Sequence, residues 1–152
     1  MPADPIFSEI MFNPTQHDVR RFFCETYRKS LAREILTPLE SIASDWIIEH
    51  PEYETDLSDV NAALEAEYPV DQGKTNPFLH LSMHLSIAEQ VAINQPGGIA
   101  PAFTQLSQRL QSVHEAHHIM MDCLGAMIWE SQRNGTPFDG AAYVTAVQQR
   151  LK

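Results

Sequence analysis

The chain has 152 residues, of which 43% are hydrophobic, and it carries ten Lys and Arg against twenty Asp and Glu. This length suits a single domain, and the hydrophobic fraction is too high for a disordered chain. The net charge of −10 argues against the clustered basic surface that nucleic acids and anionic membranes require, so we expect neither as a partner.

Three helix starts are predicted where a capping Asn or Thr precedes a proline, at Pro14, Pro38 and Pro77. Apolar residues at helical spacing then predict helices over about 14–36 and 38–49, and a shorter acidic helix over about 56–68. Residues 1–12 are expected to form an extended N-terminal arm.

Residues 79–87 alternate apolar and polar side chains, a pattern that by itself is typical of a strand. The Asn-Pro start, the length of the segment and the helix-forming tail AEQVA instead favour a helix over about 77–94. At 100° per residue, such a helix places His80 and His84 one turn apart within its more apolar face. Imidazoles directed inward need polar partners.

The break QPGGIAP at 95–101 separates this helix from a pattern that continues from Pro101 to a capping signal at Asn134-Gly135. Because one helix of that length would be about 50 Å long, we expect a kink or break near Ser112–Val113. A last helix is predicted to start near Asp139. The sequence therefore predicts one all-α domain over 1–152, a bundle or irregular array of about six to seven helices.

A second histidine cluster, HEAHH at 114–118, repeats the i, i+4 spacing of the first. Two such pairs on facing helices would supply four imidazoles to one transition-metal ion, and imidazole favours Zn, Ni, Cu or Fe. The predicted ligands are His80, His84, His114 and His118, with His117 or Glu115 as substitutes. If only three histidines bind, the open position would hold a water for metal-assisted hydrolysis or transfer.

Other interpretations of the same residues stay open. The histidines can form a buried hydrogen-bonded network with Asp122, Glu115, Ser82 or Ser86, or act in catalysis without a metal. Glu115 and His118 also make one Glu-x-x-His, but the second copy that di-iron bundles use is missing. The two remaining histidines, His17 and His50, are expected to be surface or terminus residues.

The rest of the chain carries little chemistry. It has no Walker loop, dinucleotide-binding glycine motif, nucleophile elbow or His-Glu-x-x-His, so no nucleotide or organic cofactor is indicated. Cys24 and Cys123 lack metal or redox spacing and are expected to be reduced, and we expect a soluble cytoplasmic protein. The competing function is a non-enzymatic interaction module, with a homodimer or protein partner docking on an apolar groove of the first or last helix.

Five stretches, LTPLE, HPEY, TNPFLHLSMHLSIAEQ, QPGGI and MDCLGAMIWESQRNGTPFDGAAY, together resemble a family of small bacterial proteins called domain of unknown function 1841. The resemblance spans about residues 10–150 and implies a bacterial single-domain protein. It transfers no catalytic role to any residue here, and it names no substrate. The predicted metal ligands therefore depend on the histidine spacing alone.

Overall fold

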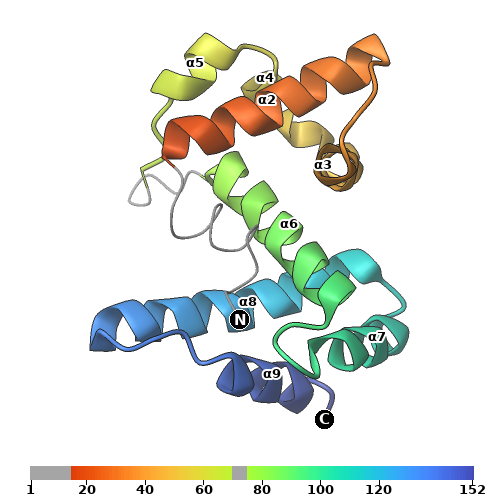
Figure 1. The fold of residues 1–152 in the computed structure, drawn as a ribbon, viewed down its shortest axis with the longest axis vertical. Coiled ribbons are helices and arrows are strands. Elements are labelled where there is room, and N and C mark those ends of the chain that lie inside the picture. Colours follow the sequence, from red (N-terminus) through yellow and green to blue (C-terminus); the bar gives the residue numbers. More distant parts are fainter. Residues whose placement is uncertain (1–14, 70–74) are drawn as a thin grey trace. The chain divides into compact units, whose positions relative to one another are not determined.

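The computed structural model describes residues 15–69 and 75–152, and all regular secondary structure in these two stretches is helical (Figure 1). The predicted all-α class is confirmed. By their internal contacts, the described residues divide into a first unit that ends at Ser86 and a second unit from Ile87 to Lys152. A single domain over 1–152 stays a prediction, and the predicted arm at 1–12 lies outside the described residues.

The first unit is built from short and medium helices. In chain order they are α2 (Gln16–Ala32), α3 (Pro38–Ile48), the 3₁₀ turn η2 (Pro51–Tyr53), α4 (Glu54–Leu57), α5 (Val60–Glu65) and the first part of α6 (Pro77–Ile93). The boundary between the two units falls inside α6, which is one continuous helix.

Side-chain caps start α3 and α6 where the proline signals predict them. The Thr37 hydroxyl accepts from the backbone N–H of Glu40 at 3.1 Å, while the Glu40 carboxylate accepts from the backbone N–H of Thr37 at 2.9 Å. At α6, the Asn76 side chain accepts from the N–H groups of Phe78 and Leu79. These bonds satisfy donors that have no partner within the helix. The helical interpretation of 77–94 is confirmed, despite the strand-like alternation.

Two predicted boundaries were wrong. Helix α2 ends at Ala32 rather than near residue 36, because Arg33 takes a left-handed conformation with φ of 58°. The acidic helix predicted over 56–68 is divided into α4 and α5. The reason is Asp59, whose extended backbone and side chain, accepting from the N–H groups of Asn61 and Ala62, cap a new helix.

A buried arginine joins three segments of the first unit. The Arg20 side chain donates to the carbonyl oxygens of Ala63 at 2.6 Å and Ala66 at 2.7 Å, which closes the end of α5. Its guanidinium also lies over the rings of Tyr68 and Phe78, at 5.4 and 5.3 Å from their centroids. Because Phe78 belongs to the first turn of α6, Arg20 positions the helix that carries the first histidine pair. The core around it contains Phe23, Cys24, Ala43, Ile47, Leu57, Ala63, Phe78, Leu81 and Leu85.

The second unit contains the end of α6 together with α7 (Ile99–Leu110), α8 (Val113–Asn134) and α9 (Gly140–Gln149). The predicted break is confirmed: Gln111 ends α7 in a left-handed conformation, and the Ser112 hydroxyl caps α8. Inside this unit the buried Tyr143 hydroxyl donates to the Gln90 side chain at 2.8 Å. None of the described helices combines the length and apolar character needed to cross a membrane.

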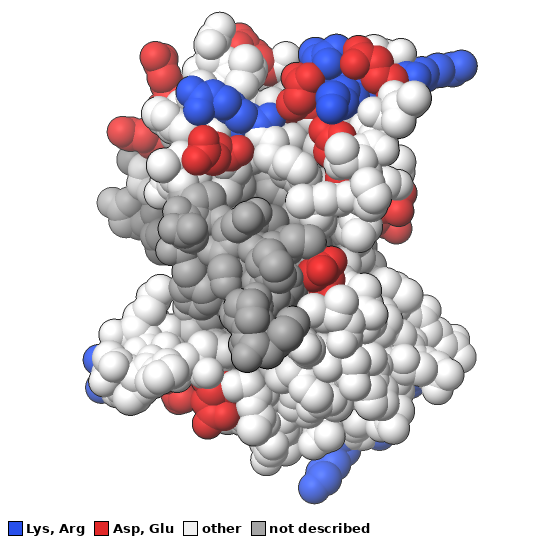
Figure 2. Space-filling model, viewed as in Figure 1, with Lys and Arg blue, Asp and Glu red and all other residues white. Residues whose placement is uncertain are grey.

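Charged side chains of the first unit alternate in sign on the face shown in Figure 2. Arg28 bonds to Glu25 and Glu34, and Lys29 bonds to Glu40, so basic groups lie among acidic ones. Such intermixing differs from the continuous basic stripe of a nucleic-acid surface. The expectation that no nucleic acid binds stays a prediction that agrees with this pattern.

Candidate metal centre

Three histidines of the first unit lie together. The Nε2 atom of His80 is 3.2 Å from the Nε2 atom of His50 and 3.2 Å from that of His84. The centroids of the three rings are 4.7 to 4.9 Å apart. His84 is fully buried and His50 is 3% exposed, whereas His80 is half-buried. The i, i+4 spacing on α6 therefore brings its two histidines together as predicted, and it adds a third from elsewhere.

The expectation that His50 is a surface or terminus residue was wrong. His50 follows the end of α3, and its Nδ1 atom lies 2.8 Å from the carbonyl oxygen of Trp46, four residues earlier. The ring of Tyr53 also stacks parallel to the His50 imidazole, with the two ring centroids 5.1 Å apart. A histidine at a helix C-terminus can satisfy a last carbonyl in this way, which is the sequence signal that was missed. The matching expectation for His17 is confirmed, since it is exposed.

Trp46 contacts this cluster a second time through its side chain. The indole stacks on the His84 ring with centroids 4.0 Å apart and an angle of 12° between the planes. One residue of α3 thus contacts His50 through its main chain and His84 through its ring. Nothing in the spacing of the sequence indicated this pairing, because 38 positions separate the two rings in the chain.

Proton positions around the three Nε2 atoms follow from the contact to Trp46. Since a carbonyl only accepts, the Nδ1 atom of His50 carries a hydrogen, and the Nε2 atom of neutral His50 presents a lone pair. In a hydrogen-bonded arrangement, the Nε2 atom of His80 then donates to His50. The Nε2 atom of His84 lies at the same distance from that of His80, and its role depends on the tautomer of His84.

The spacing of these nitrogens also fits a metal ion. Two ligands on one tetrahedral Zn²⁺, with Zn–N bonds of about 2.0–2.1 Å, are separated by about 3.3 Å. Both Nε2–Nε2 distances from His80 are 3.2 Å. A bound ion would accept one lone pair from each of the three nitrogens. The buried cluster can thus hold a metal ion or form a hydrogen-bonded network.

The second histidine pair lies on α8, in the second unit. His114 and His118 are half-buried, their ring centroids are 4.4 Å apart, and a nitrogen of one lies within 4.8 Å of a nitrogen of the other. This pair therefore also has the geometry of two ligands that can reach one ion. The ligand set of four, with two from each helix, stays a prediction.

The two substitutes proposed from the sequence differ in their surroundings. His117 is buried beside the Phe103 ring, at 5.6 Å between centroids. Burial, with smaller contributions from the charges of His114 and His118, lowers the pKa of His117 to about 3. It is therefore neutral at physiological pH. Glu115 is exposed, and so is Asp122.

The serines proposed as network partners bond elsewhere or not at all. The Ser82 hydroxyl donates to the carbonyl oxygen of Phe78 in its own helix at 2.7 Å. The Ser86 hydroxyl has no hydrogen-bond partner among the described residues. Within the part of the chain that the structure describes, neither serine bonds to a histidine. This removes two of the four partners proposed for a network.

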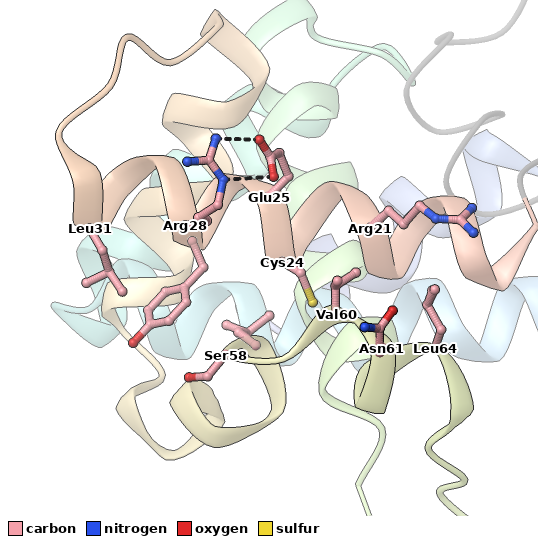
Figure 3. Close-up of a pocket in the computed structure, with 11 residues that line it drawn as sticks. Arg21, Cys24, Glu25, Arg28, Leu31, Ser58, Val60, Asn61 and Leu64 are labelled. Carbon is pink, nitrogen blue, oxygen red and sulfur yellow. Dashed lines mark hydrogen bonds and ion pairs between the residues drawn. The ribbon is translucent and has the colours of Figure 1, made fainter.

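A separate hollow of about 590 Å³ lies between α2 and the α4–α5 segment (Figure 3). Side chains of α2 face Ser58, Val60 and Leu64 across it. Its one thiol, Cys24, is free, and burial raises its pKa to about 11, so it is a protonated thiol and a poor nucleophile. The Arg28 side chain on its rim is bonded to glutamates. The hollow therefore offers an apolar surface rather than a reactive centre.

Comparison with known proteins gives one match. A family model described as "Domain of unknown function (DUF1841)" matches residues 15–149 of the chain. No curated protein and no solved structure matches the chain. The match covers the histidines of both units, so the family resemblance inferred from the five stretches is confirmed, and function has to be argued from the site.

Proposed function

Because the chain belongs to the family described as domain of unknown function DUF1841, we propose its function from the histidine site: the protein binds one transition-metal ion, Zn, Ni or Fe. The observation that carries this proposal is the convergence of three Nε2 atoms in the first unit, those of His50, His80 and His84. The location that we propose is the bacterial cytoplasm.

The geometry of the three Nε2 atoms supports a metal site. The Nε2 atom of His80 lies 3.2 Å from those of His50 and His84, which is close to the separation of two ligands on one ion. A metal ion binds all three nitrogens directly, and the main-chain carbonyl of Trp46 already orients His50 with Nε2 toward the site. The backbone and the packing thus hold a nitrogen set that matches the ligand preference of these ions.

The second pair decides what kind of site this is. We propose, from the sequence spacing, that His114 and His118 take part in holding the same ion. Three histidines leave one position of a tetrahedral ion for water, as in hydrolytic zinc enzymes, while a fourth histidine closes the site. If the double variant His114→Ala/His118→Ala releases the metal, the second pair supplies ligands and the site is closed and structural. If the double variant retains the metal, the three histidines of the first unit hold it and leave one position open, and metal-assisted hydrolysis becomes the activity to assay.

The test is elemental analysis of untagged protein that was purified without a nickel column. We expect one ion per chain in the unmodified protein and in His17→Ala, which changes an exposed histidine. His84→Ala and His50→Ala should lose most of the metal. Metal-free unmodified protein, whose stability is indifferent to chelators and to added zinc, would overturn the proposal.

A second candidate function is supported by the hollow in the first unit. Two of the apolar side chains that line it, Leu31 and Val60, are 67% and 39% exposed. We propose that this groove, on the first described helix, is where a second copy of the chain docks. Light scattering during gel filtration should then show a dimer that Leu31→Glu converts to monomer. A monomer at all concentrations up to the millimolar range excludes this function.

A further inference from the structure

The proposed metal site has one neighbour that contacts two ligands by different chemical groups. The carbonyl oxygen of Trp46 lies 2.8 Å from Nδ1 of His50, and its indole stacks on His84 with centroids 4.0 Å apart. We propose that Trp46 is a positioning residue that controls how tightly the site holds its ion. The fluorescence of Trp46 then reports whether the metal site is occupied. This inference rests on the proposed function.

The main-chain contact selects the tautomer of one ligand. With its Nδ1 hydrogen directed at the Trp46 carbonyl, His50 has its lone pair on Nε2, the atom that faces His80. Metal-bound histidines generally donate their other N–H to such an acceptor, which fixes the ring and raises its basicity. No side-chain substitution at position 46 removes this carbonyl, so the His50 contact should survive any such change.

The side-chain contact acts on the other ligand. A ring stacked at 4.0 Å and 12° limits rotation of the His84 imidazole, so less freedom is lost when the ion binds. Binding a divalent ion also makes the imidazole electron-poor, and the electron-rich indole face attracts such a ring more strongly than a neutral one. Trp46 therefore stabilises the metal-bound state of His84 more than the metal-free state.

This asymmetry gives a sharp test. Removing the indole should weaken metal binding through His84 alone. We expect Trp46→Ala to reduce affinity for Cu²⁺ about tenfold, the lower end of what loss of a ligand-orienting group produces. In a His84→Ala background the same substitution should have no further effect, whereas in a His50→Ala background the loss should persist. Cu²⁺ is the probe because it binds imidazoles tightly enough for weakened variants to be measured.

The chain offers a matched optical control, since it has only two tryptophans. Trp129 is 58% exposed and belongs to α8, in the second unit. It follows His118 by eleven positions, or about 16 Å along the helix. In Trp129→Phe, where Trp46 is the one indole left, Cu²⁺ should quench the emission with a one-to-one end point. In Trp46→Phe, the emission of Trp129 should change little at that stoichiometry.

The phenylalanine variant also guards against simple unfolding. Trp46→Phe keeps an aromatic ring at the position, so circular dichroism should show a folded protein even where Trp46→Ala unfolds. Its affinity for Cu²⁺ should fall by about two- to fivefold, because phenylalanine is the weaker partner for a positively polarised ring. Rescue of most of the alanine loss by phenylalanine supports stacking as the cause.

The same experiments separate the role of Trp46 from metal binding itself. Unmodified protein that holds one ion per chain, with folded position-46 variants of unchanged affinity, would overturn the role of Trp46 and leave metal binding intact. An effect of Trp46→Ala that is equally large in the His84→Ala background would also overturn it. Unmodified protein that binds no Cu²⁺ or native metal overturns both.

Discussion

Replacement of the buried arginine of α2 provides the most quantitative test of the fold that supports the site. Arg20 is 5% exposed, and its neighbour Arg21 points outward, paired with Asp18 at 3.7 Å with a side chain 57% exposed. We therefore compare Arg20→Met with Arg21→Met. Methionine keeps most of the length and apolar packing of the stem, so the comparison isolates the guanidinium.

The magnitude follows from the contacts that the guanidinium makes. It donates to two carbonyl oxygens at 2.6 and 2.7 Å, and a hydrogen bond from a charged group contributes about 1.5–3 kcal/mol. Its two aromatic contacts at 5.3 and 5.4 Å contribute about 0.5–1 kcal/mol each. Water that reaches the freed carbonyls and the apolar gain of methionine offset part of the sum. We expect Arg20→Met to lower the free energy of unfolding by about 3–5 kcal/mol.

Urea denaturation followed by circular dichroism measures this difference. Arg21→Met should change the free energy of unfolding by less than about 0.5 kcal/mol, as is typical of an exposed ion pair. A loss below about 1 kcal/mol for Arg20→Met, or equal losses for the two variants, would contradict the stabilising role of the Arg20 guanidinium. Either result would mean that the closure of α5 by Arg20 does not support the first unit.

Three further predictions concern the site, the second unit and the cap of α3. Zinc at about 100 times its dissociation constant should raise the free energy of unfolding by about 2.7 kcal/mol, and a similar gain in His84→Ala would count against the site. Tyr143→Phe leaves the buried side-chain oxygen of Gln90 without its donor and should lower the free energy of unfolding in urea by about 1–3 kcal/mol. An unchanged urea midpoint would contradict a stabilising role for this hydrogen bond. The backbone N–H of Thr37 holds the pKa of Glu40 below its ordinary value of 4.5, so this carboxylate stabilises the fold above that pH, and the stability is lost as pH falls through the lowered pKa. Glu40→Gln should therefore flatten the fall in melting temperature on acidification, and an unaltered pH profile would argue against that role.

Much of the helical layout could be predicted because the signals are local. Thr37 with Glu40, Asn76 before Pro77, and Gly135 at the end of α8 each act within one turn, so a short stretch contains both the cap and the group it satisfies. The two wrongly predicted boundaries also depend on single residues. Arg33 ends α2 before the predicted position, and Asp59 starts a new helix where the apolar pattern continues. Helical spacing alone does not say which of two allowed conformations a boundary residue will take.

The candidate site divides in the same way. The pairing of His80 with His84 on α6, and of His114 with His118 on α8, could be predicted from the sequence. At 3.6 residues per turn, positions i and i+4 lie side by side on a helix. By contrast, long-range packing brings His50, 30 positions from His80, to the first pair, and it places Trp46 against both His50 and His84. The physical reason is that these contacts depend on how α3 packs within the core of the first unit. Packing energy is summed over many side chains distant in the sequence, so no spacing rule contains it.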